Sequence, residues 1–184
     1  MTAKHHCALV TALATALSAG AALATALSAG AALAQTAIPP APADFAMSAA
    51  QSDQYEILAA QDAITQSQNA SIRAFAQQMI QNHTKSSADL RQAAAASGMK
   101  PPPPAMSSDQ ALMLSALQSL RGADFDKTYA RQQVLAHTQA LAVEQSFATS
   151  GSDPNFRKVA QSGVPMIQHH LEMAKQISAA LGAP

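Results

Sequence analysis

The chain has 184 residues, with eleven Lys and Arg side chains against eleven Asp and Glu and no tryptophan. This balance leaves no basic surface for nucleic acid, so we expect no nucleic-acid partner. The only cysteine is Cys7. Because Cys7 falls in the apolar N-terminal segment, the rest of the chain has no disulfide, no thiolate ligand for a metal and no cysteine nucleophile.

The first 34 residues are predicted to be a signal peptide. Lys4 precedes an Ala- and Leu-rich run, which repeats the sequence ATALSAGAAL at 14–23 and 24–33 and ends at Ala32-Leu33-Ala34. Small residues at 32 and 34 favour cleavage before Gln35. We therefore expect a periplasmic or secreted protein without strong membrane association after cleavage. The alternative is an uncleaved anchor, because the run is long enough to span a bilayer.

The first half of the remaining chain predicts two long helices. Residues 35–43 form a proline-rich linker before a helix over 44–68. Asn69-Ala70 is a tight break, and Ser71 is expected to cap a second helix over 71–97. Abundant Ala, Gln, Leu and Met favour helices here, since these residues have high helix propensity.

A long connection follows the second helix. Pro101–Pro104 predict a stiff spacer, and Ser107 and Gln110 have the spacing of a capping box that begins a short helix ending near Gly122. A connection over 98–122 suits the long crossover of a ferritin-like four-helix bundle, which makes the second and third long helices parallel. The alternative is an up-and-down bundle with a decorated loop.

Two further long helices complete the expected bundle, which spans 44–182. Asp124 is expected to cap a helix that ends near Thr149. Asp153-Pro154 combines a cap with a proline at the first helical position of the last helix. We expect Gly163-Val164-Pro165 to interrupt that helix, because proline lacks the N–H of the helical ladder. Gly182 ends it.

Each long helix directs a potential metal ligand toward the core. At 100° per residue, His83 lies on one stripe with Met79 and Leu90, and His170 shares a stripe with Met166 and other apolar residues. The candidate metal ligands are therefore Glu56, His83, His137 and His170, with Asp126 and Glu144 on the polar line of the third long helix as further candidates.

These candidate ligands also match in depth. Glu56 and His83 each lie about 13 residues from the break at 69–70, which corresponds to roughly 20 Å along an antiparallel pair. His137 lies at a similar depth in the third long helix, and His170 is level with it to within a turn. The matching depths predict that the four side chains meet inside the bundle.

The segments that carry these residues resemble a bacterial secreted family known as domain of unknown function 4142, often described as a predicted outer membrane protein. They are SAAQSDQYEILAAQDA, IRAFAQQMIQNHTKSSADL, FDKTYARQQVLAHTQAL and VPMIQHHLEMA, within residues 44–181. The resemblance implies a ferritin-like bundle outside the cytoplasm and no established activity. It marks Glu56, His83, Phe125-Asp126, Tyr129, His137, Pro165 and His170. Asn82 stands where the family commonly has Asp, which would weaken a site that depends on that acid.

Two readings of the inward histidines follow. In the first, a central His/Glu site binds a metal ion or a small ligand, and three imidazoles with a carboxylate suit a transition metal such as Zn, Fe, Mn or Cu. In the second, the histidines only stabilise the fold of a structural or interaction module of the cell envelope. A di-iron oxidase is not expected, because no Glu stands three residues before any of these histidines. The sequence contains no hydrolase or cofactor motif and names no protein partner.

Overall fold

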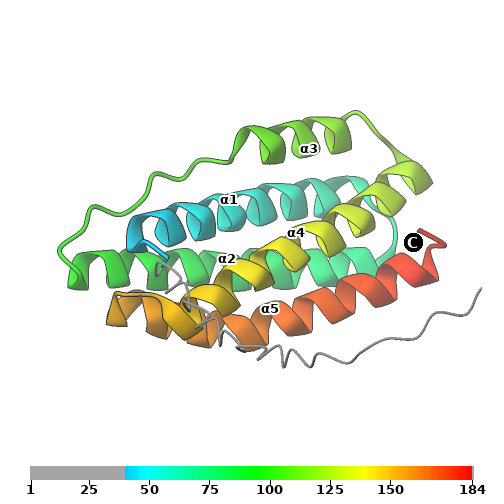
Figure 1. Cartoon of the computed structure of the whole chain (residues 1–184). Coiled ribbons are helices and arrows are strands. Elements are labelled where there is room, and N and C mark those ends of the chain that lie inside the picture. The colour runs from blue at the N-terminus through cyan, green and yellow to red at the C-terminus, as the bar shows by residue number, and fades with distance from the viewer. Residues whose placement is uncertain (1–39, 184) are drawn as a thin grey trace, which may run out of the picture. The chain divides into compact units, whose positions relative to one another are not determined.

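The computed structural model describes residues 40–183, which form five helices (Figure 1). These are α1 (Pro42–Gln66), α2 (Ala70–Ala96), α3 (Ser108–Gln118), α4 (Gly122–Ser150) and α5 (Pro154–Ala180). No strand occurs in this range, and the predicted all-α class is confirmed. The expected signal peptide, its cleavage site and most of the linker lie outside the described residues.

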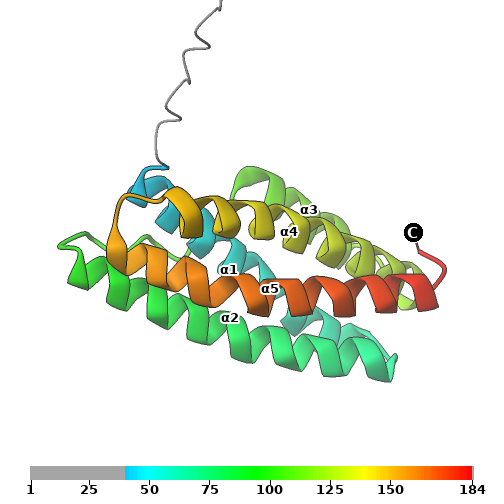
Figure 2. The same ribbon diagram turned by 60° about the horizontal axis from the view of Figure 1, so that its bottom comes forward.

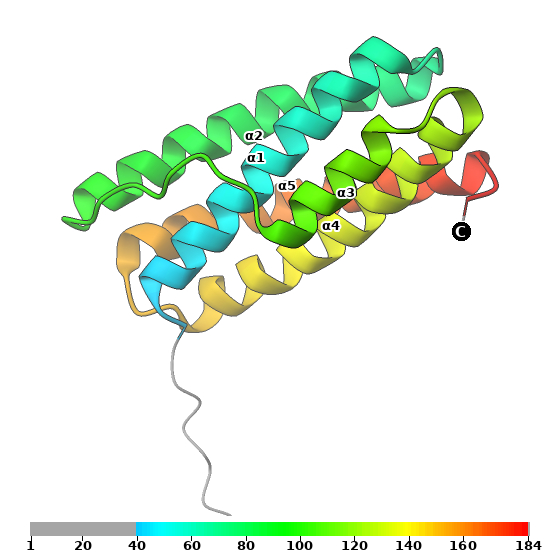
Figure 3. The same ribbon diagram turned by 90° about the horizontal axis from the view of Figure 1, so that it is seen from above.

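The four long helices pack as two hairpins. α1 packs on α2, α4 packs on α5, and the hairpins meet through contacts of α1 with α4 and of α2 with α5. Figure 2 shows α5 lying along both α2 and α4. α2 and α4 run in the same direction (Figure 1), because the chain crosses the length of the bundle between them. α3 interrupts this crossover and packs on α1 and α4 (Figure 3).

Helix α2 begins one residue earlier than the sequence suggests. Asn69, not Ser71, is its cap: the Asn69 side chain accepts hydrogen bonds from the backbone N–H groups of Ser71 and Ile72. Asparagine and serine are comparable capping residues, so the sequence alone does not decide between them. Helix α1 also begins early, at Pro42, because proline is well suited to the first helical turn.

Helix α4 begins before Asp124, the residue that was expected to cap it. The helix begins at Gly122, and its N-cap residue Arg121 makes no side-chain cap within the described residues. Asp124 lies in the first turn, where a carboxylate interacts favourably with the positive end of the helix dipole. Gly122 has a φ of 58°, a conformation that glycine adopts readily.

The interruption predicted at Gly163-Val164-Pro165 is wrong, since α5 is continuous from Pro154 to Ala180. Pro165 removes one backbone hydrogen bond, which would otherwise reach the carbonyl of Gln161. Both residues are exposed, so water is available to that carbonyl. The buried face of the same helix, which includes Ala160 and Ile167, packs without a break.

Two apolar clusters form the core. One lies toward the α1–α2 turn and includes Tyr55, Phe75, Met79, Leu117 and Phe125. The other lies at the opposite end and includes Phe45, Leu90, Phe147 and Phe156, with the rings of Phe45 and Phe147 stacked 4.2 Å apart. On each of α2, α4 and α5, one buried histidine lies between the residues that belong to the two clusters. The histidines therefore lie between the two apolar clusters, and Phe75 of the first cluster packs beside His137 and His170.

Candidate metal centre

Three histidines from three helices meet between the apolar clusters. The ring centroids of His83, His137 and His170 are 5.3 to 5.8 Å apart. One nitrogen from each ring lies within 4.8 Å of those of the other two. Their exposed fractions are 3%, 1% and 0%. Helical phase and depth had placed these residues on inward stripes, and the structure brings all three together.

A second group holds each imidazole through its other nitrogen. Nδ1 of His83 is 2.8 Å from Oδ1 of Asp53, and Nδ1 of His137 donates to the carbonyl of Gln133 at 2.9 Å. Nε2 of His170 is 2.8 Å from the side-chain amide of Asn82. Metal-bound histidines in proteins are oriented in this way, by a hydrogen bond at the nitrogen that does not bind the metal.

The remaining nitrogens are the ones available to an ion. They are His83 Nε2, His137 Nε2 and His170 Nδ1, and none has a hydrogen-bond partner among residues 40–183. We call them the available nitrogens. For His170 this role requires a proton on Nε2, and Asn82 provides the acceptor when its amide oxygen faces the ring. Asn82 therefore orients His170, on another helix, and not its sequence neighbour His83.

Glu56 reaches the same place from α1. Its Oε1 is 3.7 Å from Nδ1 of His137, and neither carboxylate oxygen has a hydrogen-bond partner in the described part of the chain. Burial raises the pKa of Glu56 to about 7, although the nearby His83 acts in the opposite direction. Glu56 therefore lies beside His137 but outside the group of three close imidazole nitrogens.

The charge states of the histidines differ because their surroundings differ. Burial, together with the charge of His83, lowers the pKa of both His137 and His170 to about 3, so both are neutral at neutral pH. Burial also opposes the charge on His83, but its bond to Asp53 and the charges of Asp53 and Glu56 raise its pKa. The site thus contains two neutral imidazoles and a third, His83, whose surroundings favour the protonated form.

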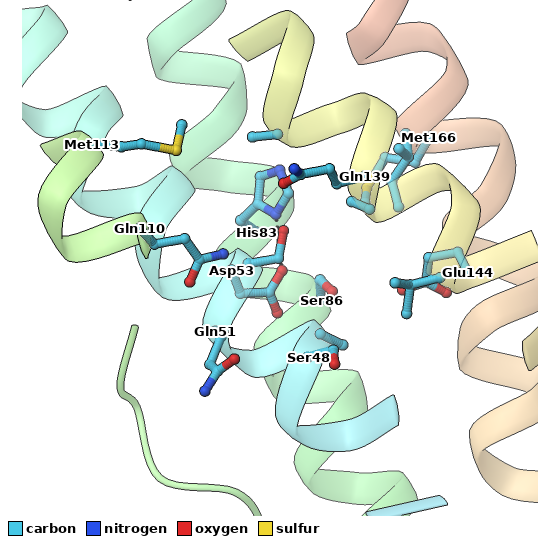
Figure 4. Close-up of a pocket in the computed structure, with 16 residues that line it drawn as sticks. Ser48, Gln51, Asp53, His83, Ser86, Gln110, Met113, Gln139, Glu144 and Met166 are labelled. Atoms are coloured by element: carbon cyan, nitrogen blue, oxygen red, sulfur yellow. Dashed lines mark hydrogen bonds and ion pairs between the residues drawn. The ribbon is translucent and has the colours of Figure 1, made fainter. Parts of the chain in front are cut away.

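The two further candidates lie outside the histidine group. Asp126 is half-buried one helical turn before Ala130, and the structure gives it no contact with the histidines. Glu144 is buried and lines a cavity together with Asp53 and His83 (Figure 4). The cavity places the carboxylate on the approach to the histidines.

The sequence analysis missed Asp53, the partner of His83. Asp53 is 3% exposed, and its second oxygen accepts a hydrogen bond from Ser87 at 3.0 Å. It stands three residues before Glu56, and residues at this spacing share a helix face. That spacing is the signal that could have identified it.

Each of the three rings has one buried nitrogen without a partner among residues 40–183. A buried polar atom without a partner costs about 1–3 kcal/mol, and folded proteins contain few of them. Because the three imidazoles lie within reach of one another, a single ion could bind all three. Imidazole ligands, with a carboxylate nearby, fit Zn(II), Cu(II), Fe or Mn.

A family model described as Domain of unknown function (DUF4142) matches residues 25–177. The chain belongs to this family. No curated protein matches the DUF4142 chain. Among solved structures, it is similar to one described as CopM in the Cu(II)-bound form, with a TM-score of 0.67 and 17% sequence identity. The similarity covers 78% of the DUF4142 chain and 99% of the other, and at this identity it shows the fold alone. Within residues 40–183 no helix is long and apolar enough to cross a membrane.

Replacing Asp53 by asparagine in this DUF4142 protein is expected to lower the pKa of His83, because the negative charge beside Nδ1 is lost. The free energy of unfolding should also fall by about 2 kcal/mol, the usual worth of a charge-assisted hydrogen bond. NMR titration of the imidazole and urea unfolding measure the two effects. Asp44→Asn, at an exposed site on the same helix, is the control. An unchanged His83 pKa would contradict the assigned role of Asp53.

Proposed function

We propose that this DUF4142 protein is an exported metal-binding protein that holds one transition metal ion inside its helical bundle. His83, His137 and His170 would bind the ion through the available nitrogens, and Glu56 would complete the donor set. The observation that carries the proposal is the convergence of three buried imidazole nitrogens within 4.8 Å. Each ring also has one nitrogen that lacks a partner among residues 40–183.

Copper(II) is the first ion to test. Imidazole and carboxylate donors accept Zn(II), Fe, Mn and Cu(II), and Cu(II) binds most tightly to a given set of such donors. The Cu(II)-bound state of a protein with a similar fold supports the same choice. When bound, the ion supplies positive charge and open coordination positions.

The orientation of the three rings, and the neutral state of two of them, would prepare them to bind the ion. His137 and His170 are neutral and could bind an ion without losing a proton, whereas His83, whose pKa is raised, would have to be deprotonated to bind it. Asp53, the carbonyl of Gln133 and the amide of Asn82 hold the rings in place. The apolar clusters on both sides exclude water from the pair of neutral rings.

Addition of Cu(II) to the exported form, purified without a histidine tag, is expected to give one bound ion per chain. A free ion concentration one hundred times the Kd should raise the free energy of unfolding by about 2.7 kcal/mol, because the ion binds only the folded state. Elemental analysis and thermal unfolding with and without chelator measure both. Thermal unfolding that Cu(II), Zn(II), Fe(II) and Mn(II) all leave unchanged would exclude this function.

The second candidate is a structural module of the cell envelope. It is favoured by the hydrogen bonds that already engage one nitrogen of every ring. In that case the three histidines specify how the helices pack, and a chelator has no effect on stability. The same thermal experiment therefore separates the two functions.

Export is part of the proposal and rests on the Ala32-Leu33-Ala34 sequence before Gln35. Expression of the full chain in a Gram-negative host is expected to yield a periplasmic protein whose N-terminal residue is Gln35. Edman degradation or intact mass spectrometry checks this. An Ala34→Asp variant should keep the full length, because signal peptidase requires a small residue there. Wild-type protein with its first residues intact in the membrane fraction would support an anchor instead.

A further inference from the structure

The histidines are too deeply buried for an ion to reach them directly from solvent. Each of the three side chains, His83, His137 and His170, is exposed by 3% or less. Of the three, His83 lines a cavity of about 170 Å³. The cavity is also lined by exposed residues, Ser48 and Gln139, so it extends from the bundle surface to His83 (Figure 4).

Glu144 stands at the junction of this cavity with a second one. The second cavity, also about 170 Å³, is lined by Asn82, the partner of His170. Glu144, Ser86 and Met166 line both cavities. A carboxylate, a hydroxyl and a thioether from three helices therefore lie where the two approaches to the histidines meet.

Glu144 has no structural partner that explains its position. Its side chain is buried, with an exposed fraction of 7%, and Oε2 has no hydrogen-bond partner within the described residues. Burial and the neighbouring charge of Asp53 raise its pKa to about 8. Leaving a carboxyl group buried in this way is unfavourable. The fold nonetheless makes room for it.

Gly163 on α5 provides that room. A Cβ atom at position 163 would lie 3.1 Å from Oε2 of Glu144, closer than ordinary van der Waals contact. Met166 lies one turn farther along the same helix. The glycine thus keeps the carboxylate free to turn toward an ion that the thioether also contacts.

We propose that the cavity is the entry route of the metal ion, and that Glu144, with Ser86 and Met166, forms a transfer site which the ion occupies before it reaches His83. This inference rests on the proposed function and adds a second, kinetic site to it. The incoming cation replaces the proton of Glu144, and the proton leaves to solvent. The ion then moves to the imidazoles, and the carboxyl group takes up a proton again.

The test is the rate of Cu(II) loading into the exported form. Because the chain has two tyrosines and no tryptophan, quenching of tyrosine fluorescence by Cu(II) in a stopped-flow instrument reports the loading. Glu144→Gln should lower the second-order rate constant roughly tenfold, because glutamine has no carboxylate to bind the ion before it reaches His83. The dissociation rate should fall by the same factor, so the Kd stays within about twofold.

Two variants complete the experiment. Glu172→Gln, at an exposed glutamate on α5, should load at the wild-type rate. Met166→Leu keeps the volume and removes the thioether, so it should also slow loading with little effect on the Kd, and it serves if Glu144→Gln does not fold. Wild-type protein that binds Cu(II) while both site variants load at the wild-type rate overturns the transfer site alone. A Kd raised by Glu144→Gln with an unchanged loading rate overturns it too. No binding by the wild type overturns the proposed function, and this inference with it.

Discussion

Replacing His170 by alanine is expected to lower the affinity for Cu(II) by more than about a hundredfold, because the loss of a group that only orients a metal ligand already costs about ten- to a hundredfold. The same change should lower the free energy of unfolding by on the order of 3 kcal/mol. His170 is 0% exposed, so its removal leaves a cavity, and the amide of Asn82 loses its partner. Equilibrium Cu(II) titration and urea unfolding measure the two losses.

His169 provides a matched control one residue away. Its side chain is exposed on the same helix, so His169→Ala should change the stability by about 0.5 kcal/mol or less. Cu(II) affinity should stay at the wild-type value. Equal effects of the two substitutions would show that the ion does not bind in the interior of the bundle. A Cu(II)-dependent gain in stability that survives in His170→Ala would place the ion at other residues.

The stability of the metal-free protein is expected to be nearly constant between about pH 4.5 and 6.5 and to fall on both sides. His137 and His170 have pKa values lowered to about 3, so the unfolded chain binds more protons at these groups. Their contribution is complete above the unfolded value of about 6.5 and is lost as the pH falls through 3. Glu56 and Glu144, with pKa values raised to about 7 and about 8, act in the opposite direction.

The two effects cancel only where both operate. Between pH 4.5 and 6.5, a rise in pH favours folding through the histidines and opposes it through the glutamates. Above pH 6.5 the contribution of His137 and His170 is complete, while Glu56, Glu144 and His83, whose pKa values are raised, hold more protons in the folded chain. Stability should therefore decrease with rising pH, by about 1 kcal/mol per pH unit for each glutamate until the pH passes its folded pKa. Below pH 4.5 only the histidines contribute, and stability should decrease by a similar amount for each of them.

Urea unfolding from pH 3.5 to 8.5, in the presence of a chelator, checks this profile. Glu144→Gln should remove part of the decrease above pH 6.5 and leave the acid side unchanged, because glutamine does not ionise. Stability that rises steadily from pH 6.5 to 8.5 would contradict the raised pKa values of both carboxyl groups.

The sequence predicted the helices and the inward residues because both depend on local rules. Glu56, His83 and His170 stand out by helical phase, and their depths follow from the rise of 1.5 Å per residue. The predicted interruption at Pro165 was wrong because these local rules do not consider whether the proline faces solvent. An exposed proline costs the helix less than a buried one, and only the packed structure shows which face it occupies.

The partners of the rings could not be predicted from the sequence. Asp53 bonds His83 and Asn82 bonds His170 across helix interfaces. Such pairs depend on how far each helix is rotated and on side-chain rotamers, which sequence spacing does not fix. The cavity beside Glu144 depends on the same details, because it is the space that packing leaves unfilled.

Both hairpins contribute to the candidate metal centre: His83 comes from α1–α2, while His137 and His170 come from α4–α5. An ion bound there would cross-link the two hairpins, which are otherwise joined by the crossover and by the packing of their helices. Separation of the hairpins would then require release of the ion. Hydrogen exchange at the interface between α2 and α5 should therefore slow on metal binding far more than exchange at the helix ends. Amides at the ends exchange by local fraying, which does not require release of the ion.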